Sequence, residues 1–284
     1  MDDYVEDEYL SDKHFGKVAE AFSRKSQIYD TFAEEHLQLI DMRRRVREHV
    51  LSFHRPGDRI LELNAGTGAD AAYLASHGLR VHATDIAPGM VEEIKRKIQS
   101  RGLENRLTLQ VCSFMELEKV AFAPFDHVFS NMGGLNCTPD LAPVARGIEK
   151  VLRPAGLVTL IVMPRICPWE LFRALRGDLR LAARRLHSQG VLASVEGVHF
   201  RTFYYSPKTI QEAFGPQFHL LHLQSLALFT PTADHKKFAI SRPRLYRCLR
   251  ALDRIFVRLP VFRQWGDFFM LTLRYSPSGQ GYGY

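Results

Sequence analysis

Two glycines and an acid lie at a spacing that can hold a nucleotide-like cofactor. Gly66 and Gly68 follow the apolar run Arg59–Leu63 and precede a helical stretch that begins at Ala69. Glycine lets the backbone approach a ligand closely at positive φ, and a helix start presents unpaired N–H groups. Asp85 ends the next expected strand, 19 residues beyond Gly66, where an acid can accept hydrogen bonds from both hydroxyls of a ribose.

Glu62 distinguishes between two classes of cofactor. A dinucleotide brings a pyrophosphate, which a carboxylate at the mouth of the turn would repel. S-adenosylmethionine has no phosphate and carries an ammonium and a sulfonium, so an acid at the end of the first strand suits it. The chain also lacks a third glycine at dinucleotide spacing, which disfavours a nicotinamide oxidoreductase.

These residues resemble a known enzyme family. The spacing Glu62-x-Asn64-x-Gly66-x-Gly68 resembles the first motif of class I S-adenosylmethionine-dependent methyltransferases, and Asp85 resembles their ribose-binding acid. Three further segments extend the resemblance: 125–131 is similar to the fourth-strand motif, 151–156 to the turn before the fifth strand, and Tyr29-Asp30 to the entry segment of small-molecule, quinone-biosynthesis-like members. The family usually has Gly at position 64, and Asn tolerates left-handed backbone better than other residues with a side chain.

The resemblance implies a Rossmann-like α/β fold with helical cap segments. Its sheet would have seven strands in the order 3-2-1-4-5-7-6, the last strand antiparallel. Strands that alternate with helices along the chain independently predict a parallel sheet covered on both faces. The cofactor contacts that the resemblance implies come from Tyr29, Glu62, Asn64, Gly66, Gly68, Asp85, Ile86, Met90, Ser113, Phe114 and Asn131. Ser113 stands where the family usually has an acid.

The catalytic and substrate-binding residues are less clear. Methyl transfer is an in-line displacement that mainly needs alignment and exclusion of water. His199, Tyr204 and Tyr205 are candidates for a catalytic role, and Asn136 and Arg201 for substrate binding. The alternative is that residues 198–205 simply alternate along a strand, which aromatic residues favour. No spacing of cysteines or histidines predicts a metal site.

The coarse element pattern divides the chain into a core and caps. We expect a single methyltransferase domain over residues 1–275, with an N-terminal helical cap over 1–55 and a cofactor-binding core over 56–165. Cap insertions are expected over 166–205 and 230–266, and a flexible tail over 276–284. In the N-terminal cap, amphipathic helices are expected at about 11–26 and 29–54.

Positive charge is concentrated in the last part of the chain. The net charge is +7, but residues 166–284 alone hold 17 Lys and Arg against 7 Asp and Glu, a balance of +10. Two basic helices are expected, at 168–187 and 243–259. On the second, Leu245 and Phe256 share one face and Arg247 and Arg254 the opposite one. An ordinary surface helix would bury the apolar face; alternatively, both helices form a lid that recruits an anionic or lipid-linked substrate, or they dock on an acidic membrane.

The expected activity is O- or C-methylation of a small, lipophilic or anionic molecule with S-adenosyl-L-methionine as cofactor. Two alternatives stay open: an RNA methyltransferase, prompted by the basic half, and a non-catalytic S-adenosylmethionine-binding module. Nucleic acid is disfavoured because the fourth-strand segment lacks the Asn/Asp-Pro-Pro-aromatic pattern of amino-directed nucleic-acid enzymes. Scattered cysteines and an acidic start predict a cytoplasmic protein, with peripheral membrane contact through the basic helices.

Overall fold

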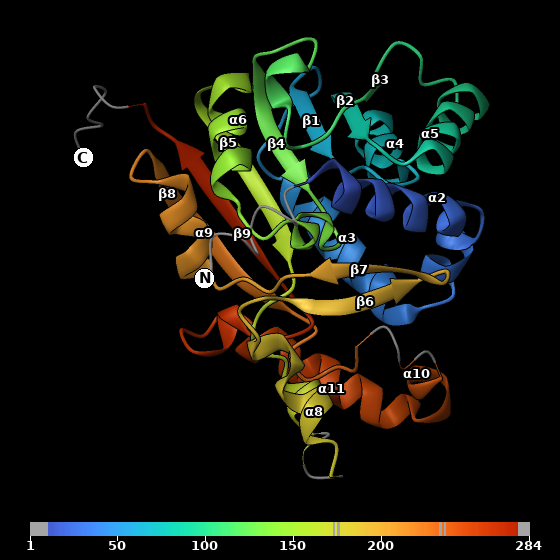
Figure 1. Cartoon of the computed structure of the whole chain (residues 1–284), viewed down its shortest axis with the longest axis vertical. Helices are drawn as coiled ribbons and strands as arrows, with labels where there is room; N and C mark the ends of the chain where they lie inside the picture. Colours follow the sequence, from blue (N-terminus) through green and yellow to red (C-terminus); the bar gives the residue numbers. More distant parts are fainter. Residues whose placement is uncertain (1–10, 173, 175–176, 233–234, 236, 278–284) are drawn as a thin grey trace.

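Seven strands form one mostly parallel sheet at the centre of the molecule (Figure 1). The computed structural model describes residues 11–277 apart from 173, 175–176, 233–234 and 236. The strands are β1 (Arg59–Leu63), β2 (Arg80–Asp85), β3 (Leu107–Val111), β4 (Phe125–Ser130), β5 (Leu152–Val162), β8 (Phe218–Leu226) and β9 (Phe268–Tyr275). They lie in the order β3-β2-β1-β4-β5-β9-β8, and β9 is antiparallel to both of its neighbours. The expected strand order, with its antiparallel last strand, is confirmed.

Helices cover both faces of this sheet. One face packs against α3 (Leu37–Leu51), α4 (Ala69–Ser76) and α5 (Pro88–Ser100). The other packs against α6 (Ala142–Val151), α9 (Pro207–Phe214) and the short η1 (Leu117–Lys119). Successive residues of β4 serve the two cores in turn, with Val128 in one and Phe129 in the other. A strand that is buried on both sides is mostly apolar on both, as residues 157–162 of β5 are. β4 is also buried along its whole length, although it carries the polar residues Asp126, His127 and Ser130.

The carboxyl ends of the parallel strands are covered by segments outside the sheet. Helix α2 (Asp12–Glu34) and the antiparallel hairpin β6 (Val191–Val195) and β7 (Val198–Thr202) lie below these ends in Figure 1. The prediction of helices at about 11–26 and 29–54 was wrong in its boundary, because α2 continues through Tyr29-Asp30 to Glu34. Asp30 accepts a hydrogen bond from Thr67, two residues before α4, so this part of α2 is attached to the core.

The two basic segments fold differently from each other. Among the described residues, the first forms α7 (Pro168–Leu171), α8 (Leu179–Ala183) and η4 (Arg184–Leu186), so the prediction of one helix over 168–187 was wrong. The second forms α10 (Phe238–Ser241), α11 (Pro243–Phe256) and η6 (Phe262–Gln264), close to expectation. The expected tail reaches beyond the described residues, which end at 277.

Candidate functional site

The turn after β1 has the geometry that its residues predict. Asn64, Gly66 and Gly68 all have positive φ, at 43°, 57° and 72°, and α4 begins directly after Gly68. Asn64 is therefore in the left-handed region that the family's usual glycine would occupy without strain. Its side-chain Oδ1 accepts a hydrogen bond from Ser130 Oγ at 3.0 Å, which ties the turn to the end of β4.

A pocket with an empty volume of about 690 Å³ lies over this turn at the carboxyl edge of the sheet. Eight of the residues expected to contact the cofactor line it: Tyr29, Asn64, Gly66, Asp85, Ile86, Met90, Phe114 and Asn131. Glu62, Gly68 and Ser113 are not among its wall residues. Gly68 instead packs against Ile94, which a Cβ at that position would approach to 2.9 Å.

Asp85 is held in the pocket wall by backbone donors. Its Oδ2 accepts from the Gly66 N–H at 2.8 Å and its Oδ1 from the Ala87 N–H at 2.9 Å. Burial raises the pKa of Asp85 to about 6, although these two N–H groups act in the opposite direction. Each oxygen keeps a second lone pair, so the ionised carboxylate can accept two further hydrogen bonds, as a ribose diol requires.

Glu62 lies behind the turn in a buried charged cluster. Only 2% of it is exposed, and its Oε2 has no hydrogen-bond partner among the described residues. Burial and the nearby Asp70 raise the pKa of Glu62 well above its usual range. An unpaired buried acceptor of this kind is costly unless a donor or a cation reaches it.

Asp70 is a site residue that the sequence reasoning missed. Its Oδ1 accepts from Arg47 Nε at 2.6 Å and its Oδ2 from Asn131 Nδ2 at 2.8 Å. Through the second bond it fixes the amide of Asn131, whose Oδ1 accepts from the Met132 N–H at 2.8 Å. The sequence does show an acid in the first turn of the helix that follows the glycine motif. Its contact with Asn131 could not be predicted, because Asn131 follows a strand that is distant in the sequence.

Helix α2 supplies the apolar wall opposite the turn. Phe15, Val18, Ala19 and Phe22 line the pocket together with Tyr29. None of the first four was expected, because these residues are far in sequence from the glycine motif and reach the same pocket only through tertiary packing. Met132, Gly133 and Gly134, which directly follow Asn131 and were expected beside the methyl group, also line the pocket. The other wall residues that were missed are Ala87, Cys112 and Cys137.

The candidate catalytic side chains lie elsewhere. His199 and the substrate candidate Arg201 line a separate surface hollow, and Arg201 donates to the carbonyl oxygens of Gln189 and Gly190 at 2.8 and 3.2 Å. The Tyr204 ring lies under the Arg185 guanidinium, 5.2 Å from its centroid. The Tyr205 hydroxyl donates to the Thr138 carbonyl.

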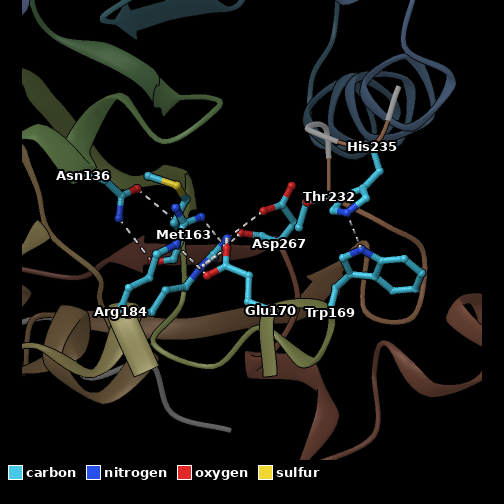
Figure 2. Close-up of polar contacts among 9 residues, drawn as sticks. Asn136, Met163, Trp169, Glu170, Arg184, Thr232, His235 and Asp267 are labelled. Carbon is cyan, nitrogen blue, oxygen red and sulfur yellow. Dashed lines mark hydrogen bonds and ion pairs between the residues drawn. The ribbon is translucent and has the colours of Figure 1, made fainter. Parts of the chain in front are cut away.

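Asn136, the other substrate candidate, bridges two backbone segments (Figure 2). Its Nδ2 donates to the carbonyls of Met163 and Phe203 at 3.2 and 2.6 Å, and its Oδ1 accepts from the Met163 N–H at 2.9 Å. The side chain is fully buried. Its amide thus joins the end of β5 to the chain that leaves β7.

The residues of the pocket fit S-adenosylmethionine. A Cβ at Gly66 would have only the Tyr29 ring nearby, at 4.0 Å, so the turn leaves open space where the ligand's backbone contacts would lie. The carboxylate of Asp85, with a lone pair free on each oxygen, suits the ribose hydroxyls.

Comparison with known proteins identifies the same segment. A methyltransferase-domain family matches residues 60–156. The chain is 33% identical over 123 residues to a demethylmenaquinone methyltransferase of Beutenbergia cavernae, covering 43% of this chain and 48% of the relative. It is 29% identical over 177 residues to a malonyl-[acyl-carrier protein] O-methyltransferase of Pseudescherichia vulneris, covering 62% and 65%. The chain thus spans about half to two thirds of the length of these curated relatives.

The likeness extends to solved structures. The DhpI–SAM–HEP complex aligns with 93% of this chain and 99% of its own, at a TM-score of 0.58 and 14% identity. At that identity the likeness shows the fold alone, which is the fold built here from the sheet order. With the glycine turn after β1, the acid at the end of β2 and the matched domain over residues 60–156, this chain carries a methyltransferase domain with the Rossmann-like fold of class I S-adenosylmethionine-dependent methyltransferases.

Proposed function

We propose that this protein transfers a methyl group from S-adenosylmethionine to a small, largely apolar molecule whose acceptor oxygen or carbon is already anionic. The observation that carries the proposal is the composition of the pocket wall. It joins the polar cofactor edge at Gly66 and Asp85 to an apolar surface formed by Phe15, Val18 and Phe22. When bound, S-adenosylmethionine supplies an electrophilic methyl group.

The described wall residues offer no suitable general base. Asp85 already accepts two backbone hydrogen bonds and is assigned to the ribose. Burial raises the pKa of Tyr29 above its usual value and that of the Cys137 thiol to about 12, so both stay protonated near neutral pH. A base must reach the proton that it removes, and His199, Tyr204 and Tyr205 have the other placements described above. An acceptor that enters as a carboxylate or an acidic enolate needs no such base.

The chain's own residues then act by positioning and by excluding water. The apolar side chains of α2 desolvate the acceptor, and the Asn131 amide, fixed by Asp70, can orient it beside the turn. The relative named for malonyl-[acyl-carrier protein] supports an acidic acceptor, and the one named for demethylmenaquinone supports a lipophilic one.

The test is methyl transfer from deuterium-labelled S-adenosylmethionine to a panel of apolar carboxylic acids and enolisable ketones, with labelled products identified by mass spectrometry. We expect the Phe22→Ala variant to lower kcat/KM at least ten-fold, since a buried phenyl ring contributes about 1.5–3 kcal/mol. Phe53→Ala, which removes a ring that is 38% exposed, is the matched control. Cofactor binding without any transfer would support the non-catalytic alternative, and loss of activity on ribonuclease treatment the RNA alternative.

A further inference from the structure

Helix α11 covers only part of the apolar face that its pattern predicts. Its buried residues are Tyr246 and Asp253, at about 100° and 80° on a helical wheel that starts at Leu245. Ile255, at about 280°, lies on the opposite side and is 65% exposed. Leu259, three residues beyond the end of the helix, is 42% exposed. Of the expected apolar face, Leu249, Leu252 and Phe256 are half-buried and Leu245 is 43% exposed, so the helix buries this face only in part.

The reason lies in the bonds that Asp253 makes. Its Oδ1 accepts from the Phe229 N–H at 2.7 Å and its Oδ2 from Thr230 Oγ1 at 2.8 Å, which caps the chain that leaves β8. Arg250 adds an ion pair to Asp41 of α3 at 2.7 Å. These polar contacts fix the rotation of α11, so that Leu245 and Ile255 of the helix and Leu259 just beyond its end form an apolar stripe that meets solvent.

Arginines flank this apolar stripe. Arg244, Arg247, Arg254 and Arg258 all lie on exposed positions of the segment and form no ion pair with any described residue. The only acid of α11 is the buried Asp253, so the exposed side of the helix carries positive charge alone. Arg254 and Arg258 also line a surface hollow with Arg45 and Glu48 of α3, and Arg258 Nε donates to Gln224 Oε1 at 3.1 Å.

The first basic segment lies against the second and extends the same end of the molecule. The Trp169 ring of α7 meets Phe238 of α10 edge to face, with centroids 5.4 Å apart. Glu170 accepts from Arg184 and Arg185, and Arg185 pairs with Asp267 at 2.9 Å, which anchors the segment to the start of β9 (Figure 2). Further exposed apolar side chains lie on these segments: Phe172, Leu179, Leu186, Ile240 and Val261. Figure 1 shows α8, α10 and α11 together at the end below the hairpin.

We propose that the exposed face of α11 docks on an acidic phospholipid membrane, with Ile255 and Leu259 inserted at the interface and Arg254 and Arg258 on the lipid phosphates. A helix that combines an exposed aliphatic stripe with arginines is the pattern of an interfacial helix. No helix among the described residues could cross a bilayer, so the contact is peripheral. A nucleic acid would use the arginines but gain nothing from aliphatic side chains, and no aromatic ring lies on this stripe for base stacking.

The experiment is sedimentation of the full chain with sucrose-loaded vesicles of phosphatidylcholine, alone or with 30 mol% phosphatidylglycerol. We expect binding to the acidic vesicles only, weakened by raising NaCl from 50 to 500 mM. Arg254→Gln/Arg258→Gln should lower the partition coefficient roughly 25-fold, at about five-fold per arginine near the surface. Ile255→Glu/Leu259→Glu should lower it at least as much, because it also removes the inserted groups.

Matched controls lie on other surfaces of the protein. Arg96→Gln/Lys208→Gln removes the same charge from α5 and α9, and Leu192→Glu/Leu221→Glu changes two exposed leucines of β6 and β8. All four variants should bind S-adenosylhomocysteine like the parent, which separates docking from folding and from the proposed methyl transfer. Equal binding to neutral vesicles, or equal losses in the control variants, would overturn the proposal. So would a dimer that Ile255→Glu/Leu259→Glu dissociates, or retention by RNA in preference to acidic vesicles.

Discussion

The Asn64 side chain packs directly against Gly134, where the turn after β1 meets the segment that follows β4. A Cβ at Gly134 would lie 1.9 Å from Asn64 Nδ2, so the amide occupies the space that a side chain there would need. We expect Gly134→Ala to displace the Asn64 side chain and to lower the free energy of unfolding by about 1–3 kcal/mol, the usual cost of overpacking. Urea unfolding, together with calorimetric titration of S-adenosylhomocysteine, measures both effects.

The double variant tests whether the clash itself is responsible. Asn64→Gly removes the amide and should tolerate alanine at position 134, so Asn64→Gly/Gly134→Ala should recover most of the stability that Gly134→Ala loses. Gly16→Ala on α2, where a Cβ would meet nothing within 4 Å, should be neutral or stabilising. A strictly additive double variant would mean that the two positions are independent.

Asp85 should matter more for binding the cofactor than the other acids that cap backbone N–H groups. In Asp85→Asn one of the two backbone N–H groups, of Gly66 or Ala87, would face an NH₂ donor instead of an acceptor. We expect S-adenosylhomocysteine to bind about 10- to 100-fold more weakly, since a hydrogen bond to a charged group contributes about 1.5–3 kcal/mol. Asp140→Asn is the matched control, because Asp140 Oδ1 also accepts a backbone N–H, from Ala142 at 2.8 Å, away from the pocket wall. Equal weakening in both variants would contradict the assignment of Asp85 to the ribose.

At the scale of elements, α2 covers the cofactor pocket and is held there by polar contacts to the core. Ser23 Oγ accepts from the Gly89 N–H at 2.8 Å, and the Asp30 carboxylate joins Thr67 Oγ1 and Lys97 Nζ, each at 2.5 Å. We expect Asp30→Asn to increase the dissociation rate of S-adenosylhomocysteine by about five- to ten-fold with a smaller change in the association rate, because contact losses act mainly on dissociation. Surface plasmon resonance on the immobilised protein measures both rates.

The control for these contacts lies on the same helix. Glu20 pairs with Arg24 on the solvent side of α2, where both side chains are about half exposed. Glu20→Gln should leave both rates unchanged, because an exposed ion pair contributes little. If the dissociation rate in Asp30→Asn were as unchanged as in Glu20→Gln, the Asp30 carboxylate would not be what keeps α2 over the pocket.

The elements that could be predicted are those with local signals. The strand-turn-helix around Gly66 and the acid at Asp85 follow from patterns within a few dozen residues, whereas the sheet order came from the family resemblance. The wall that α2 provides could not be predicted, since Phe15 and Phe22 meet the glycine turn only through tertiary packing. The rotation of α11 could not be predicted for a related reason. Asp253 is a polar residue, but it is buried because its carboxylate accepts a hydrogen bond from the Phe229 N–H after β8.

At the scale of the whole molecule, buried histidines connect stability to pH. His127 on β4 is fully buried and its Nδ1 lies 2.7 Å from His54 Nε2, while His49 Nε2 lies 2.8 Å from Thr272 Oγ1 on β9. Burial lowers the pKa of all three, that of His49 to about 4 and that of His127 well below its usual value. The neutral imidazoles therefore fit the fold, and protonated ones do not.

The sign of the pH effect follows from these shifts. The unfolded chain binds protons on these histidines near pH 6.5, whereas folded His49 binds one only near pH 4. Stability is thus fully present above about pH 6.5 and falls as the pH drops towards 4. The raised pKa of Asp85, about 6, acts the other way and offsets part of the loss.

Urea unfolding at pH 7 and pH 5 should detect this loss. We expect the free energy of unfolding to fall by roughly 1–2 kcal/mol for His49 alone, after allowance for its partial exposure. His49→Gln keeps a partner for Thr272 and cannot titrate, so it should flatten the pH dependence between 6.5 and 5. The exposed His199, changed in the same way, is the control and should leave the profile as it is. The opposite result would be the same free energy of unfolding at pH 7 and pH 5, both for the parent protein and for His49→Gln. It would mean that burial of the imidazoles does not govern stability, because they would already be protonated in the folded protein.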